Sequence, residues 1–147
     1  MTEAQAQAQW ELGKLVHDLD MQCYARMRDW VAGPAGLGLT VAQASALREM
    51  TGPMTMRELA GRMSCEPSNA TVVVDNLESH RLIERRPHPT DRRAKQLVLT
   101  PEGAGLRDRL LTVLAEEPLF TGLTQDEQDA LQGLLKRALS RAEILQA

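Results

Sequence analysis

Apolar residues recur at helical spacing from the N-terminus onward. In the first long segment, from about residue 7 to residue 31, they stand three or four positions apart, at Leu12, Leu15, Val16, Leu19, Cys23, Met27 and Trp30. This spacing predicts one amphipathic helix of about 25 residues, about 37 Å long. Because a small domain does not need so long a helix for its own core, we expect the excess length to pack against another subunit. Glycine and proline in residues 33–38 end it.

Later helix starts share a second pattern, a threonine followed three residues on by glutamine or glutamate. In such a capping box each side chain bonds a backbone amide at the helix start. The three boxes begin at Thr40, Thr55 and Thr124. Pro67 and the pair Thr100-Pro101 predict two further starts, since proline suits the first helical position. The helix after Pro67 carries a buried apolar face at Ala70, Val73, Val74 and Leu77.

Two short segments with partial alternation, residues 82–86 and 95–99, predict the strands of a β-hairpin. Residues 87–94 join them as a long, basic tip stiffened by Pro87 and Pro89. Helical periodicity returns over about residues 101–116 and 125–145. The fold class is therefore mostly α with one small β-hairpin, and we expect residues 1–147 to form a single domain.

The order of short helix, tight turn at residues 64–66, second helix and basic hairpin predicts a winged helix-turn-helix over residues 40–99. In such a unit the second helix enters the major groove of duplex DNA while its apolar face packs on the first helix. The residues then expected to face DNA are Ser68, Asn69, Thr71, Val72 and Asn76. The expected contacts from the hairpin, or wing, are Arg85, Arg86, His88, Asp91, Arg92, Arg93 and Lys95.

The charge distribution supports a nucleic-acid partner, although the net charge of −3 does not. Residues 81–95 hold six basic and two acidic side chains, a local charge of +4, which leaves −7 for the rest of the chain. A basic patch on an acidic body is typical of DNA-binding proteins.

Other features exclude several classes of protein. The polar N-terminus does not resemble a secretory signal, and no apolar stretch is long enough to span a bilayer. The two cysteines lack metal spacing, the three histidines are scattered, and no glycine-rich phosphate loop is present, so we expect no enzyme, metal or cofactor. These features together predict a cytoplasmic protein without a membrane partner.

One motif runs through the predicted hairpin and into the helix after it: Leu82-Ile83-Glu84-Arg85, then Asp91-Arg92-Arg93 followed by Leu97, Leu99-Thr100 and Gly103. On this motif the sequence resembles the multiple-antibiotic-resistance regulator (MarR) family. The resemblance implies a homodimer whose dimerisation helices, residues 7–32 and 101–146, interlock. It implies DNA binding through the recognition helix and the wing, and release by a small-molecule effector.

Two details of the resemblance concern single residues. In the family an acid of the wing pairs with the arginine two residues later, here Asp91 with Arg93. Many members carry arginine on the DNA face of the recognition helix where this chain has Val72. Valine can contact a thymine methyl group but cannot bond a guanine edge, so base preference should differ and more of the affinity should come from the wing.

The residues leave two alternatives open. A branch of the family senses hydroperoxides through a cysteine of its N-terminal helix, and Cys23 makes this chain a candidate thiol sensor of the same fold. A winged helix can also serve as a protein-interaction module without binding DNA. The predicted function is a repressor that binds a pseudo-palindromic operator.

Overall fold

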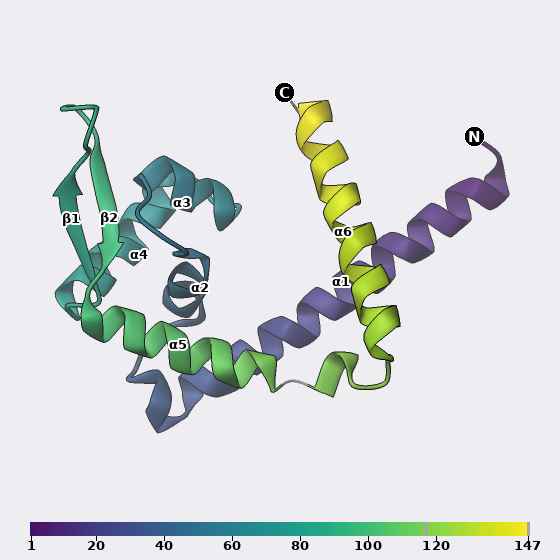
Figure 1. Cartoon of the computed structure of the whole chain (residues 1–147), viewed down its shortest axis with the longest axis horizontal. Coiled ribbons are helices and arrows are strands. Elements are labelled where there is room, and N and C mark those ends of the chain that lie inside the picture. Colours follow the sequence, from purple (N-terminus) through teal and green to yellow (C-terminus); the bar gives the residue numbers. More distant parts are fainter. Residues whose placement is uncertain (117, 147) are drawn as a thin grey trace. The chain divides into compact units, whose positions relative to one another are not determined.

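The computed structural model describes residues 1–116 and 118–146 and divides the chain into two compact units, Met1–Glu116 and Glu117–Ala147. We describe each unit by itself. The first holds helices α1 to α5, a 3₁₀ turn at Pro34–Gly36 and a hairpin, and the second holds a 3₁₀ turn at Pro118–Phe120 and helix α6 (Gln125–Gln146) (Figure 1). No helix among these residues has the length and apolar character needed to cross a membrane.

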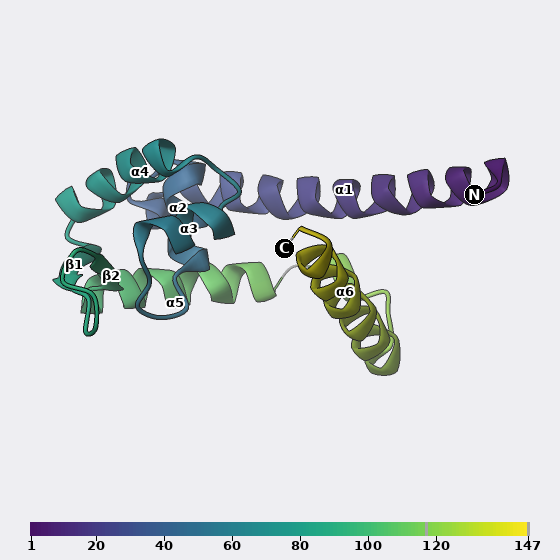
Figure 2. The ribbon, with the colours of Figure 1, turned by 90° about the horizontal axis from the view of Figure 1, so that it is seen from above.

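Helix α1 (Glu3–Ala32) begins four residues earlier than predicted. Thr2 and Gln5 form a capping box that the sequence analysis overlooked: the Gln5 amide donates to Thr2 Oγ1 at 3.2 Å, and the Thr2 amide donates to Gln5 Oε1 at 2.8 Å. Figures 1 and 2 show α1 as one straight helix whose N-terminal half projects past the other elements of the first unit. Only its C-terminal end is buried, at Met27 and Trp30.

Helices α2 (Val41–Glu49), α3 (Met56–Arg62) and α4 (Pro67–Ser79) follow the predicted starts. The capping boxes at Thr40 and Thr124 are complete, while at Thr55 the hydroxyl accepts the amide N–H of Glu58 at 3.2 Å. Pro67 occupies the first turn of α4, as predicted. On α4 the apolar face is confirmed, because Ala70, Val74 and Leu77 are fully buried and Val73 is partly buried.

Two arginine side chains satisfy the backbone carbonyls at the C-terminal end of α2. The guanidinium of Arg107 donates to Leu47 O at 2.9 Å and to Arg48 O at 3.0 Å, and Arg62 donates to Glu49 O at 3.0 Å. Helix ends need such partners because their last carbonyls have none within the helix. These bonds connect α2 to α3 and to α5 (Pro101–Ala115).

The predicted hairpin is confirmed as strands β1 (Ile83–Pro87) and β2 (Lys95–Leu99), paired antiparallel from Ile83 opposite Leu99 to Pro87 opposite Lys95. Its base is anchored in the core, since Ile83 and Leu97 are buried. The backbone of Met54, just before α3, also exchanges two hydrogen bonds with Leu97, of 3.2 and 2.7 Å. The wing therefore extends from a fixed base beside the helix-turn-helix.

The segment from Thr100 to Gly103, which is part of the family resemblance, packs the start of α5 against Arg81 and Leu82. Buried Thr100 caps α5 by accepting the Gly103 amide at 3.0 Å, and its hydroxyl donates to Arg81 O at 2.6 Å. A Cβ atom on Gly103 would lie 2.0 Å from Leu82 O, so only glycine fits without a shift of the backbone. This contact joins α5 to the residues that connect α4 and β1.

Candidate nucleic-acid interface

The recognition helix α4 presents one exposed polar face. Ser68, Val72 and Asn76 follow each other at steps of four residues, and Ser79 lies three residues beyond, so they share one side of the helix. All four are exposed, with Val72 at 61%, and Asn69 lies exposed beside them. Ser79 was not among the predicted contacts, although helical spacing alone could have identified it.

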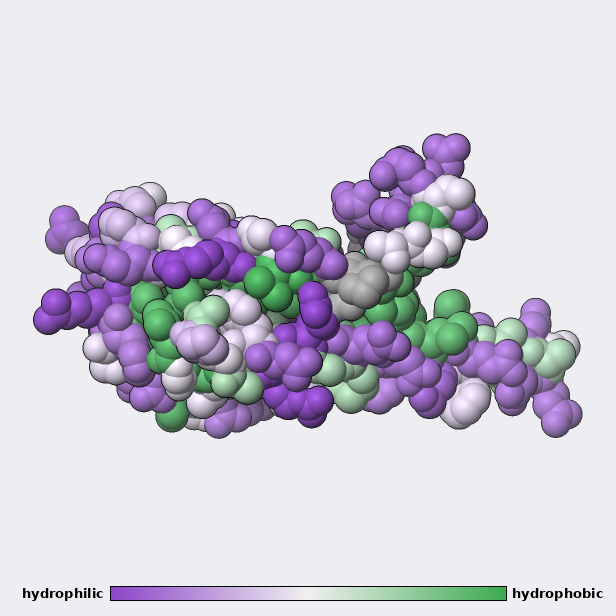
Figure 3. Space-filling model, turned by 90° about the horizontal axis from the view of Figure 1, so that it is seen from below, coloured by the Kyte–Doolittle hydropathy of each residue, from purple (hydrophilic) through white to green (hydrophobic). Residues whose placement is uncertain are grey.

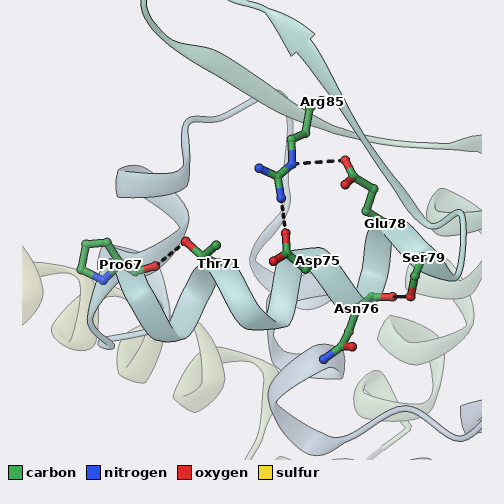
Figure 4. A network of polar contacts seen from close by, with 7 residues as sticks. All are labelled: Pro67, Thr71, Asp75, Asn76, Glu78, Ser79 and Arg85. Carbon is green, nitrogen blue, oxygen red and sulfur yellow. Dashed lines mark hydrogen bonds and ion pairs between the residues drawn. The ribbon is translucent and has the colours of Figure 1, made fainter.

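Thr71 differs from the other predicted recognition residues. It is half-buried, and its hydroxyl donates a hydrogen bond of 2.9 Å to Pro67 O one turn earlier (Figure 4). The Thr71 hydroxyl therefore donates its hydrogen within the helix and not to a ligand. Four of the five predicted residues share an exposed face, and Thr71 lies to its side, on the flank nearer Asp75 and Glu78.

An ion-pair network joins the wing to this flank of α4. The Arg85 guanidinium contacts Glu78 Oε2 through Nε at 3.2 Å, and it contacts the Asp75 carboxylate through Nη2 (Figure 4). Asn76 points away from this network, on the opposite side of the helix. Asp75 thus anchors a tertiary contact between the recognition helix and the wing.

The network gives Arg85, which the sequence analysis placed among the DNA contacts of the wing, partners within the protein. Residues 83 and 85 lie on the same face of β1, and because Ile83 points into the core, Arg85 is directed toward α4. There one guanidinium partly neutralises two carboxylates that would otherwise repel DNA phosphates. Arg85 orients the wing against the recognition helix and compensates its acidic flank.

Arg86 has a partner on its own strand. Its Nη2 lies 3.0 Å from Glu84 Oε2, and both side chains are largely exposed, at 62% and 51%. An exposed pair of this kind contributes at most about 1 kcal/mol, so Glu84 holds Arg86 weakly. Arg86 can exchange this carboxylate for a phosphate oxygen.

The wing tip carries the least compensated positive charge. Arg92, Arg93 and Lys95 are exposed, and the ion pairs among the described residues use neither these arginines nor this lysine. The implied side-chain pair of Asp91 with Arg93 is replaced by a backbone contact, because Asp91 Oδ1 accepts the Arg93 amide at 3.0 Å. Asp91 therefore shapes the tip and leaves the guanidinium exposed. His88 is half-buried at the start of the tip.

The two cysteines are free thiols of intermediate exposure. Cys23 lies on α1. Cys65 follows α3 and lines a cavity of about 300 Å³ together with Tyr24 and Met27 of α1, Ser45 and Arg48 of α2, and Met63. The cavity combines apolar walls with a few polar groups, a composition typical of small-molecule sites.

Comparison with known proteins supports one family. The model of the MarR family matches residues 39–95. The uncharacterized HTH-type transcriptional regulator YkoM of Bacillus subtilis is 34% identical over 89 residues, which are 59% of this chain and 58% of YkoM. The chain thus spans little more than half the length of this relative, and 53% of a second one, YsmB. The multiple antibiotic resistance protein MarR of Escherichia coli is 27% identical over 87% of this chain and 90% of its own length.

Solved structures extend the likeness to most of the chain. The transcriptional regulator PA3341 is 29% identical, with a TM-score of 0.78 over 90% of this chain and 98% of its own. A mutant MarR from E. coli, solved in complex with operator DNA, is 28% identical, with a TM-score of 0.67 over 88% and 94% of the two chains. The winged-helix architecture, the family match over residues 39–95 and these neighbours agree: the chain is similar to MarR-family regulators over most of its length.

Proposed function

We propose that the chain is a transcriptional regulator that binds double-stranded DNA as a homodimer, with α4 in the major groove and the wing beside it. The observation that carries the proposal is the pair of uncompensated arginines, Arg92 and Arg93, at the tip of a wing whose base is fixed to the recognition helix by Arg85. Their exposure suits phosphate or minor-groove contact. Such a role implies the cytoplasmic location expected from the sequence.

The recognition helix α4 and the wing make different kinds of contact with DNA. Ser68, Asn69 and Asn76 present hydrogen-bonding groups on the exposed face of α4, and Val72 presents a methyl-contacting surface. We assign base selection to this face and backbone positioning to the wing. The mutant MarR that was solved with operator DNA has a similar fold, which supports the assignment of the two elements.

Homodimer formation is supported by apolar side chains that remain exposed on both terminal helices. On α1, Leu12 and Leu15 are 64% and 61% exposed, and on α6, Leu134 and Leu139 are 61% and 66% exposed. Exposed apolar stripes of this kind mark association surfaces. A twofold dimer would read two half-sites about one helical turn apart, hence a pseudo-palindromic operator.

Repression with release by a small effector is the finer part of the proposal. Relatives at 40% identity over 68 residues and at 33% over 91 residues are named transcriptional repressors, MdtR and MprA. The cavity lined by Tyr24, Ser45 and Cys65 is a candidate site for a small-molecule effector. Ligands that bind the folded state raise its melting temperature, so a compound that binds in this cavity should stabilise the wild type more than a cavity-filling Ser45→Trp variant.

The central experiment measures DNA affinity over a salt series. If Arg92→Ala removes one phosphate contact per subunit, the dimer loses two, and the slope of log affinity against log salt becomes shallower by roughly 1.8. Arg109→Ala is the matched control, because it removes the same charge from an exposed position on α5. The duplexes are a selected operator and a scrambled sequence, and both should respond to Arg92→Ala.

Three outcomes would redirect or contradict parts of the proposal. An unchanged affinity and slope for both Arg92→Ala and Arg93→Ala would remove the wing from the interface and favour a protein-interaction module. Loss of DNA binding after mild peroxide, abolished by Cys23→Ser, would favour the thiol sensor. Sedimentation that shows a folded monomer at micromolar concentration would contradict the dimer.

A further inference from the structure

The wing tip, residues 88–94, is held by a small number of local hydrogen bonds. Beyond the last strand pair, Pro87 with Lys95, the His88 amide donates to Ala94 O at 3.3 Å and the Ala94 amide donates to Asp91 O at 3.3 Å. The Arg93 amide donates to the Asp91 carboxylate at 3.0 Å. Since no further strand pairs support the tip, each bond within it has a large effect on its order.

The His88 ring supplies an acceptor at the centre of the tip. Its Nδ1 lies 3.2 Å from the amide nitrogen of Thr90 and 3.1 Å from that of Asp91, and the Thr90 hydroxyl oxygen lies 3.3 Å from the same atom. A backbone amide can only donate, so Nδ1 must be unprotonated, and the neutral ring carries its proton on Nε2. The ring thus takes the place that an Asn or Asp side chain has in turns, where it accepts amides two or three residues later.

His80 makes the opposite use of the same ring atom. Its Nδ1 lies 2.7 Å from the carbonyl oxygen of Asn76 at the end of α4. A carbonyl only accepts, so His80 Nδ1 must donate, and this bond survives when the ring becomes an imidazolium. The two histidines therefore respond differently to a proton. His80 keeps its hydrogen bond to the Asn76 carbonyl, and His88 loses its hydrogen bonds from the two backbone amides.

We propose that His88 is the positioning residue of the wing, whose neutral Nδ1 orders the tip that presents Arg92 and Arg93 and whose protonation releases it. The link to DNA affinity rests on the proposed function. Histidine is the side chain whose charge ordinarily changes between about pH 5 and 8. In the imidazolium form Nδ1 is a donor that can bond the Thr90 hydroxyl oxygen but neither backbone amide, so the tip loses its central acceptor.

Other charged groups lie on the wing with His88, and none of them is an imidazole. They are Asp91, Arg92 and Arg93 on the tip, Glu84, Arg85 and Arg86 on β1, and Lys95 on β2. A loss of tip order between about pH 8 and 5.5 therefore reports the imidazole. On DNA the added charge attracts phosphate while the released tip presents its arginines less well, so the two effects must be measured separately.

The first test uses the free protein and nuclear magnetic resonance. Ring nitrogen shifts should show neutral His88 protonated on Nε2 and neutral His80 protonated on Nδ1. As the pH falls, the protection factors of the Thr90 and Asp91 amides, which are their exchange rates corrected for the intrinsic pH dependence of exchange, should drop several-fold in step with His88 protonation. A neutral His88 protonated on Nδ1, or protection factors that do not change as His88 is protonated, would overturn the proposal.

Two variants separate the acceptor from the charge. His88→Asn keeps a side-chain acceptor two residues before Thr90 but does not titrate, so it should protect both amides at high and low pH. His88→Ala should leave them unprotected throughout. If His88→Asn lost protection on acidification as the wild type does, the pH effect would arise elsewhere, since His17 and His80 remain in both proteins.

The second test measures what the tip contributes to DNA binding. The contribution is the ratio of the Kd of Arg92→Ala to that of its parent, measured at about pH 8 and about pH 5.5. In the wild-type background the ratio should approach one at the lower pH, and in the His88→Asn background it should stay constant. A constant ratio in both backgrounds would overturn the link to DNA. No DNA binding at any pH would refute the proposed function while the resonance data still decide the role of His88.

Discussion

The central part of the chain and its terminal helices use the same kind of residue at the same helical spacing, with opposite results. In the winged helix and in α5, which packs against it, Leu47, Leu77 and Leu110 are completely buried. On α1 and α6, Leu15 and Leu139 remain 61% and 66% exposed. Helix α1 contains both situations, because Met27 near its C-terminal end is 2% exposed. On the face in Figure 3, apolar surface reaches solvent along this helix.

The difference indicates where each region obtains its stability. Burying apolar surface contributes about 25 cal/mol per Å², so the winged helix gains its stability within one chain. The exposed apolar side chains of the terminal helices contribute this free energy only when another surface buries them. The following experiments test this division, beginning with the largest expected effect.

The strongest contrast comes from one truncation in each region. Leu110→Ala should lower the free energy of unfolding by about 2–5 kcal/mol, because it leaves a cavity in a packed core. Leu139→Ala should cost little within one chain and should instead weaken association. Urea unfolding at several protein concentrations separates the two, since only the Leu139 effect should vary with concentration. Equal, concentration-independent losses would remove the distinction between the regions.

A smaller effect tests the junction of hairpin and α5. Gly103→Ala places a Cβ atom 2.0 Å from the Leu82 carbonyl oxygen, and the forced backbone shift should cost about 1–3 kcal/mol. Gly105→Ala, two residues along the same helix, meets only the end of the Arg109 side chain at 4.0 Å. It should be neutral or stabilise by up to about 1 kcal/mol through helix propensity. Thermal melts of both variants suffice, and a destabilised Gly105→Ala would contradict the steric explanation.

Breaking an ion pair of the wing should have the next largest effect on the free energy of unfolding. Arg85→Ala should cost about 1 kcal/mol, since the guanidinium contacts two carboxylates of α4, and the loss should shrink as salt is added. Arg86→Ala breaks one exposed pair within β1 and should change stability very little. Unfolding at low and high ionic strength distinguishes them. If Arg86→Ala proved the more damaging, Arg85 would not be the residue that fixes the wing to α4.

The smallest effect concerns the start of α6. The pKa of Glu127 is lowered because its carboxylate accepts hydrogen bonds from the backbone amide and the hydroxyl of Thr124. A lowered folded-state pKa means that this contribution is present above the ordinary value of 4.5 and is lost as the pH falls through the folded-state value. Helix α6 should therefore fray at its N-terminus in acid, and the Glu127 carboxyl signal should titrate below its usual range. Glu127→Gln should abolish this pH dependence, and an unshifted titration would contradict the cap.

Several features of the fold followed from the sequence because they depend on neighbours within four residues. Threonine caps, the first-turn proline of α4 and the apolar face of Ala70, Val74 and Leu77 are of this kind. The start of α1 was missed although Thr2 and Gln5 carry the same local signal. This signal lies in the polar residues before the apolar stripe, so the stripe alone does not mark the start of the helix.

The sequence by itself determined the element order, the basic wing and the exposed stripe of α1, since periodicity and composition encode them directly. Only the tertiary structure decided which arginines are free: Arg85 lies ten residues from Asp75 and meets it because the hairpin base packs against α4. The need for glycine at residue 103 likewise arises from the approach of Leu82, 21 residues earlier. Such contacts depend on how elements meet in space, and the spacing of residues along one element does not specify that.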